Sequence, residues 1–154
     1  MTKYWLMKSE PGCYSIDNLK DDNETNWEGV RNFQARNFMR DEMKVGDFGL
    51  FYHSNAKPSG VYGMFQIVKT KVPDFTALDP TSQYYDPKAS QENPIWFMVD
   101  VEFREKFQIP VSIEILKNSK GLENLATLQK GSRLSITPVS KNEFEVIINL
   151  GLKK

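Results

Sequence analysis

Two long β-strand patterns in the middle of the chain restrict the fold more than any other feature. Residues 95–107 alternate between a face of Phe and Val and a face that carries Asp100, Glu102 and Arg104, as expected for a strand with one buried side. Residues 61–72 form a second long pattern, in which Gly63 indicates a bulge or a close approach of another backbone. The irregular stretch between them, residues 73–94, is long enough to suggest a functional loop.

Shorter elements surround these two strands. Strands are predicted at residues 4–7, 48–52 and 134–139, and a long helix pattern is predicted only at residues 30–39. Short helices are expected to begin after Ser15 and Ser112, and Ser140 with Glu143 fits a capping box before residues 144–150, with Gly151 as the stop. Regular βαβ alternation is missing, which excludes a Rossmann fold. We therefore predict one α+β domain, residues 1–154, on a small curved mixed or antiparallel sheet that could close into a barrel.

Composition excludes several classes of protein. The 20 basic and 20 acidic side chains balance, which argues against coating nucleic acid by bulk charge but not against gripping one base in a pocket. Cys13 and His53 are each the only residue of their type, so neither an internal disulfide nor a Cys/His zinc site can form. We predict no metal and no cofactor. Apolar runs are too short for a membrane span or a signal peptide, so we expect a cytoplasmic protein with no membrane partner.

Three polar clusters are candidates for chemistry. The first, residues 8–11, directly follows a predicted strand, and the third, residues 52–55, directly follows another. The second is rich in planar groups that make directional hydrogen bonds and can hold phosphate in two-pronged fashion; it consists of Trp27, Arg31, Asn32, Arg36 and Asn37. Polar residues at strand ends often line a binding site.

Each cluster also has a purely structural explanation. Residues 8–10 could form a turn with a solvated ion pair, Trp27 could be a half-buried core residue, and the arginines could be a solvated helix face. A lone histidine such as His53 is more often structural than catalytic. His53 and Ser54 are neighbours in an extended segment and would point to opposite faces, and the chain has no Gly-x-Ser-x-Gly elbow. We therefore predict no catalytic residues.

Taken together, the motifs resemble the EVE domain family, which has a PUA-like fold related to the YTH domains. The resemblance covers about residues 4–151 and is carried by several motifs in order: residues 8–11, residues 27–37 (Trp-x-Gly-Val-Arg-Asn-x-Gln-Ala-Arg-Asn), residues 46–47, residues 52–55, residues 85–88, Pro94-x-Trp96 and residues 131–135. It implies a PUA-like pseudobarrel with short peripheral helices. It also implies a non-enzymatic module that recognises a modified nucleobase, a modified cytosine or adenine, in DNA or RNA through an aromatic pocket.

The resemblance also suggests roles for individual residues. Trp27 is the first choice for stacking on a flipped base, with Tyr84 or Tyr85 as a second wall. Four pocket candidates could read the base edge, namely Ser9, Glu10, Asn37 and Ser54. The other two residues of the predicted pocket are His53 and Asn55. The candidates for contacts with flanking phosphates are Lys8, Arg31, Arg36 and Lys88. Two alternatives stay open: a nucleic-acid-processing enzyme that uses Glu10 and His53 as acid and base, and a binder of a small nucleoside-like metabolite.

Overall fold

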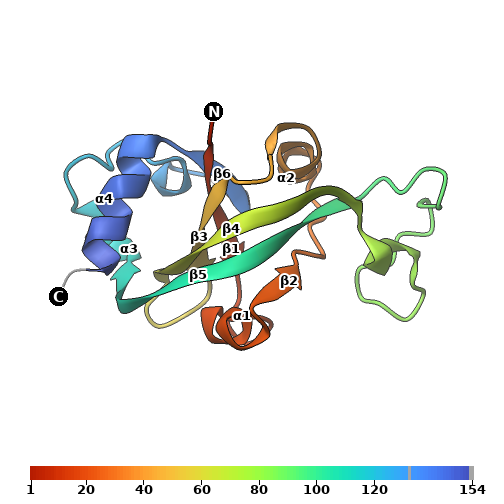
Figure 1. Cartoon of the computed structure of the whole chain (residues 1–154), viewed down its shortest axis with the longest axis horizontal. Coiled ribbons are helices and arrows are strands. Elements are labelled where there is room, and N and C mark those ends of the chain that lie inside the picture. Colours follow the sequence, from red (N-terminus) through yellow and green to blue (C-terminus); the bar gives the residue numbers. More distant parts are fainter. Residues whose placement is uncertain (132, 153–154) are drawn as a thin grey trace.

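A mixed six-stranded sheet forms the centre of the computed structural model, which describes residues 1–131 and 133–152. The strands lie in the order β2-β5-β4-β3-β1-β6 (Figure 1). Only β1 and β3 run parallel; the other neighbouring strands are antiparallel. The bounds of the strands are β1 Tyr4–Ser9, β2 Glu24–Asn26, β3 Phe48–His53, β4 Gly60–Pro73, β5 Phe97–Ser112 and β6 Ile136–Val139. The predicted α+β class with a mixed sheet is confirmed.

The helices are short and mostly capped by side chains. They are α1 Ile16–Asp22, α2 Phe33–Asn37 with the π-helical turn η1 Phe38–Glu42, the 3₁₀ turn η2 Phe75–Leu78, α3 Ile113–Lys117, the 3₁₀ turn η3 Ala126–Leu128, and α4 Lys141–Gly151. The predicted capping box of Ser140 and Glu143 is present, and Ser15 forms a second one with Asn18. Among the described residues, no helix combines the length and the apolar character that a membrane span requires.

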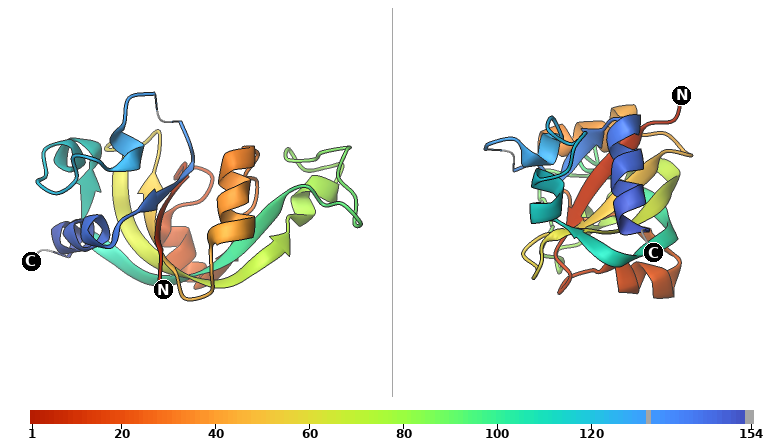
Figure 2. Two further views of the ribbon diagram at one scale, coloured as in Figure 1. Left: turned by 90° about the horizontal axis from the view of Figure 1, so that it is seen from above. Right: turned by 90° about the vertical axis from the view of Figure 1, so that its left-hand side faces the viewer.

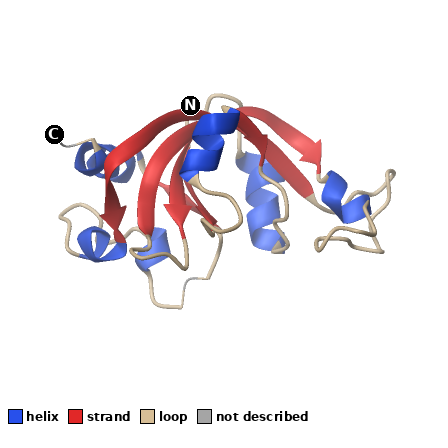
Figure 3. Cartoon of the chain, turned by 90° about the horizontal axis from the view of Figure 1, so that it is seen from below, coloured by secondary structure: helices blue, strands red, loops and turns tan. Residues whose placement is uncertain are grey.

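The strands β4 and β5 pair along most of their length and bow strongly, so that the sheet arches over the helices on its concave side (Figures 2 and 3). One shift in their register falls between Val61 and Gly63. A Cβ atom at Gly63 would lie 2.4 Å from the carbonyl oxygen of Glu105 and would also meet Ile16. The predicted close approach at Gly63 is therefore confirmed, and it lets α1 pack directly on the sheet.

The sheet separates two hydrophobic cores. In β1, Trp5 and Met7 point to the core that contacts α1 and α2, whereas Leu6 points to the core that contacts α3 and α4. Phe51 and Leu50 divide in the same way in β3. This alternation follows from the pleat of a strand, in which successive side chains point to opposite faces.

Several boundaries differ from the sequence predictions. The predicted helix 30–39 begins at Phe33, because Asn32 caps it by accepting from the N–H of Ala35. The strand predicted to end at Phe107 continues to Ser112, and β2 at Glu24–Asn26 lies where no strand is predicted. Gly151 is the last residue of α4 and not a stop after it. A glycine is needed there because a Cβ atom would lie 2.2 Å from the ring of Phe107.

Candidate nucleic-acid interface

The first and third polar clusters meet where the parallel strands β1 and β3 end. Ser9 pairs with His53 in the register, and the backbone N–H of Ser54 donates to the carbonyl of Ser9 at 3.1 Å. Just beyond, the side-chain amide of Asn55 donates to Glu10 at 2.7 Å. The sheet topology therefore brings together two clusters that lie more than 40 residues apart in the sequence.

Lys8 is on the opposite face of the sheet from Ser9 and His53. Its Nζ lies 5.5 Å from the ring centre of Tyr52, its partner in the register, which belongs to the core on the α3 and α4 side. Partial burial lowers the pKa of the Lys8 ammonium. Trp27 belongs to the other core, so the sheet places the predicted phosphate contact at Lys8 and the predicted stacking residue on different faces.

His53 has a structural environment. It is 5% exposed, its ring stacks on Tyr62 at 4.0 Å between centres, and it meets Phe51 edge-on. Its Nε2 accepts the backbone N–H of Ile16, the first residue of α1, at 3.1 Å. Burial lowers the pKa of His53, with Asp17 opposing that effect, so the neutral imidazole is favoured. The nitrogen that a general base would use is occupied, so the geometry gives the Glu10 and His53 enzyme no support.

Trp27 is buried to 8% exposure and packs between Phe51 and Phe65, with ring centres 5.3 and 5.5 Å away. Its indole N–H distinguishes it from the other two tryptophans: Trp5 donates to Asp47 and Trp96 donates to Asp86, whereas Trp27 has no acceptor among the described residues.

The indole nitrogen of Trp27 is not completely buried. In the described part of the chain, Thr137 Oγ1 is the buried side-chain polar atom without a partner. The indole nitrogen of Trp27 also has no partner among the described residues. It is not one of the fully buried polar atoms that lack a partner, so part of it remains accessible to solvent. Trp27 therefore combines a packed ring with a hydrogen-bond donor that is free of protein partners among the described residues.

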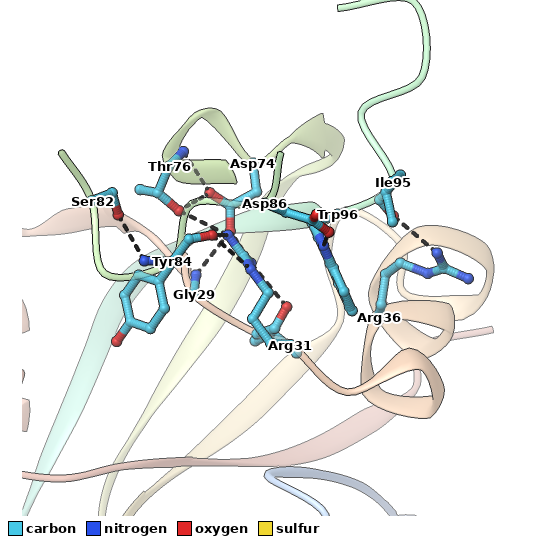
Figure 4. A network of polar contacts seen from close by, with 11 residues as sticks. Gly29, Arg31, Arg36, Asp74, Thr76, Ser82, Tyr84, Asp86, Ile95 and Trp96 are labelled. Atoms are coloured by element: carbon cyan, nitrogen blue, oxygen red, sulfur yellow. Dashed lines mark hydrogen bonds and ion pairs between the residues drawn. The ribbon is translucent and has the colours of Figure 1, made fainter. Parts of the chain in front are cut away.

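Arg31 fastens the segment after Trp27 to the loop that follows β4 (Figure 4). The guanidinium donates twice to the carbonyl of Tyr84, and once each to the carbonyl of Val30, to Asp74 and to Thr76. These bonds use all five N–H donors of an arginine. In this arrangement Arg31 has no donor left for the phosphate contact that the sequence suggested.

The partner carboxylate, Asp74, is fully buried. Burial raises the pKa of this carboxyl, but hydrogen bonds from Thr76, Gly29 and Arg31 outweigh that effect and hold its pKa below the ordinary value. These contacts explain the glycine of the Trp-x-Gly motif. Gly29 has a φ of +83° and donates its N–H to Asp74 at 2.8 Å.

Tyr84 packs directly on Gly29. A Cβ atom at Gly29 would lie 2.6 Å from Cζ of the Tyr84 ring. The half-buried Tyr84 thus closes over the segment that carries Trp27, whereas Tyr85 is exposed. Lys88 lies exposed farther along the same loop.

The remaining residues of the second cluster lie on α2. Arg36 donates from Nη1 to the carbonyl of Ile95 at 3.0 Å, and from Nε and Nη2 to the side-chain oxygen of Asn37. Trp96 stands between Arg31 and Arg36, seen edge-on in Figure 4. Its ring lies 5.2 Å from the guanidinium carbon of Arg31 and 5.9 Å from that of Arg36.

Sequence reasoning missed Asp74, Asp86 and Trp96 as parts of this region. Asp74 and Asp86 lie in the stretch predicted as irregular, and Trp96 was assigned to a strand. One signal was available: Asp74 precedes Thr76 by two residues, a spacing at which an Asp side chain binds the backbone and opens a turn. Within residues 1–131 and 133–152, no three His, Cys, Asp or Glu side chains are grouped so that they could share a metal ion.

Comparisons with known proteins agree with this architecture over nearly the whole chain. The model of the EVE domain matches residues 3–150. Thymocyte nuclear protein 1 of Mus musculus is 38% identical over 168 residues, which cover 97% of this chain and 74% of that protein. A hypothetical protein from Leishmania major has a structure with a TM-score of 0.93 and 45% identity, covering 98% of this chain and 95% of the other. The crystal structure of human THYN1 protein in complex with DNA containing 5-methylcytosine has a TM-score of 0.88 and 38% identity, covering 99% of both chains.

Proposed function

Because this chain belongs to the EVE domain family, we propose that it binds a modified nucleobase in DNA or RNA without catalysing a reaction on it. The observation that carries the proposal is the indole N–H of Trp27, which is not completely buried and has no acceptor among the described residues, although the ring itself is buried. The similarity to human THYN1 protein in complex with DNA containing 5-methylcytosine supports a modified cytosine in DNA as the first ligand to test.

The chemistry of the site suits a flat ligand with polar edges. An indole N–H donates to an acceptor on a base edge, and aromatic rings provide stacking surface. Ser9 uses its hydroxyl hydrogen on the carbonyl of Tyr14, so its oxygen can still accept from an exocyclic amino group. Asn37 accepts from Arg36 with its oxygen, which leaves its amide N–H groups to donate. We propose these three side chains as the readers of the base, with Tyr84 or Tyr85 as the second wall.

Of the four residues suggested for phosphate contacts, we propose two, Arg36 and Lys88. Arg36 keeps one N–H on each of its terminal nitrogens without a partner among the described residues, and Lys88 is exposed on the neighbouring loop. Both can neutralise phosphates of a bound strand. Glu10, Ser54 and Asn55 lie together at the end of the parallel strands and are proposed to line the rim of the site.

Fluorescence anisotropy with labelled oligonucleotides tests the proposal. We would compare 5-methylcytosine, N6-methyladenine and unmodified bases in single- and double-stranded DNA and RNA. The wild type should prefer one modified base, and Trp27→Phe should weaken its binding roughly tenfold, because one hydrogen bond of about 1–1.5 kcal/mol is lost. Equal affinity for modified and unmodified oligonucleotides would overturn the proposal.

A matched control uses the same substitution at another buried tryptophan. Trp5→Phe removes the hydrogen bond to Asp47, which lies in the core, so it should lower the melting temperature and leave the affinity of the folded protein unchanged. Trp27→Phe should weaken binding by the folded protein, and it should lower the melting temperature only through the volume it removes between Phe51 and Phe65. Mass spectrometry of the oligonucleotides after incubation would detect products if the protein were an enzyme, and equal affinity for the free nucleoside would favour a metabolite binder. The cytoplasmic location stays a prediction that a fluorescent fusion can test.

A further inference from the structure

Phe33 is a large apolar side chain that is 58% exposed yet held in a defined position. Its ring stacks on that of Trp96, with 4.8 Å between centres and 20° between planes. Trp96 is buried, and its indole N–H is fixed by a 2.7 Å bond to Asp86. An exposed aromatic ring that is already immobilised loses little further entropy when a ligand stacks on it.

Phe33 is the outer layer of a stack. The guanidinium of Arg31 lies against Trp96, and Arg36 of α2 lies on the other side of that ring (Figure 4). Phe33 lies on α2 with Arg36, and its exposed ring stacks on that of Trp96, which the guanidinium of Arg31 also contacts. Arg31 is held by bonds from all five of its donors, whereas Phe33 is exposed. The stack of Arg31, Trp96 and Phe33 is therefore fixed at Arg31 and open to a ligand at Phe33.

A cation accompanies the exposed ring. The guanidinium carbon of Arg36 lies 4.8 Å from the centre of Phe33, held by its bonds to Ile95 and Asn37. Its two remaining N–H groups have no acceptor among the described residues. A flat apolar surface beside a cation with free N–H donors complements a nucleotide, whose base stacks and whose phosphate accepts in two-pronged fashion. A purely apolar partner would cover the ring and leave the guanidinium unpaired.

We propose that Phe33 and Arg36 hold the nucleotide next to the modified base, with Phe33 stacking on that base and Arg36 binding its phosphate. This inference rests on the proposed function. We place this nucleotide at Phe33 because Trp27 and Phe33 lie on one segment, which the bonds of Arg31 fasten to the loop that carries Asp74 and Tyr84. The pair therefore contributes affinity for a strand that extends beyond the pocket, and none for a mononucleotide held in the pocket at Trp27.

The proposal is tested by measuring the binding of two ligands, an oligonucleotide and a mononucleotide, to three variants. The ligands are a short single-stranded oligonucleotide with one 5-methylcytosine and the corresponding mononucleotide. Phe33→Leu should weaken oligonucleotide binding roughly tenfold, since stacking contributes about 1–3 kcal/mol per base, and Phe33→Tyr should restore it. Mononucleotide binding should be the same in all variants. Ile109→Ala is the control, because Ile109 is 59% exposed and lies near the far end of β5.

The outcomes separate this inference from the proposed function. If the wild type binds the modified oligonucleotide and Phe33→Leu binds it equally well, the stacking role is wrong and the proposed function stands. An equal loss of mononucleotide binding in Phe33→Leu would also overturn the inference, because it would assign Phe33 to the base pocket. A wild type that binds neither ligand overturns both. Arg36→Gln should lower the slope of log affinity against log salt by about 1, and an unchanged slope would remove Arg36 from the site.

Discussion

Arg31 and Asp74, 43 residues apart in the sequence, form an ion pair with 3.0 Å between Nη1 and Oδ2. The carboxylate is fully buried and the arginine is largely covered. The pair fastens the backbone around Gly29 to the loop between β4 and β5, and that loop carries Tyr84. The position of one wall of the proposed site therefore depends on a single buried carboxylate.

Replacing Arg31 by Ala should destabilise the protein by about 3–5 kcal/mol, because it leaves the charge of Asp74 buried without its cation. Arg31→Lys should recover only part of this, since an ammonium cannot reproduce the five directional bonds. Urea unfolding followed by circular dichroism measures the free energy of unfolding of each variant.

Arg104→Ala provides the control for this experiment. Arg104 pairs with Glu102 in β5, but both side chains are about one-third exposed. Such a pair contributes about 0–1 kcal/mol. Similar losses for Arg31→Ala and Arg104→Ala would contradict the view that the Arg31 pair holds the loop.

Gly29→Ala should lower stability for two separable reasons. A φ of +83° costs a non-glycine residue about 1–2 kcal/mol, and the new Cβ atom would collide with the Tyr84 ring. Gly131→Ala is the matched control, since Gly131 has a φ of +80° and no atom of the described residues lies within 4 Å of its added Cβ. The difference in unfolding free energy between the two variants measures the packing of Tyr84 on Gly29. No difference would mean that the Tyr84 ring moves aside freely.

The single histidine predicts a specific pH dependence of stability. Burial lowers the pKa of His53 below its ordinary value of 6.5, so the unfolded chain takes up a proton before the folded chain does. The stabilisation is then complete above pH 6.5 and is lost as the pH falls towards the pKa of the folded state. Thermal unfolding between pH 7 and about 5.5 follows this effect above the ordinary range of carboxylates. Because burial raises the pKa of Glu28, a variant of His53 is needed to assign the dependence.

His53→Gln is the variant that identifies the source of this dependence. The side-chain oxygen of Gln can accept the N–H of Ile16, as His53 Nε2 does, but it does not titrate. The melting temperature of the variant should vary less than that of the wild type over this interval. Parallel curves for the two proteins would show that His53 keeps an ordinary pKa.

Local signals were sufficient to predict many features of this fold. Ser140 and Glu143 form the predicted capping box because a cap depends on residues three apart, and Gly63 lies at the predicted close approach because only glycine fits there. The alternation of side chains in a strand also implies that Lys8 and Ser9 face opposite sides of the sheet. That inference was available from the sequence, although both residues were grouped in one cluster.

Hydrogen-bond partners that lie far apart in the sequence could not be predicted from it. Arg31 has the residue type expected of a phosphate ligand, and only the fold brings Asp74, Thr76 and the carbonyl of Tyr84 to its five donors. The sequence likewise does not show which indole N–H, that of Trp27 or that of Trp96, is free. Asp86 ties the indole N–H of Trp96, whereas that of Trp27 keeps contact with solvent.

Thr137→Val should stabilise the protein. Thr137 is 2% exposed in β6, opposite Leu6 of β1, and its Oγ1 has no hydrogen-bond partner among the described residues. A buried hydroxyl without a partner costs about 1–3 kcal/mol, and valine has nearly the same shape, so the gain in unfolding free energy should be about 1 kcal/mol. The comparison variant is Thr76→Val, in which the lost hydroxyl donates to Asp74 and accepts from Arg31. That variant should lose stability, and a loss in Thr137→Val as well would show that its hydroxyl has a partner in solution.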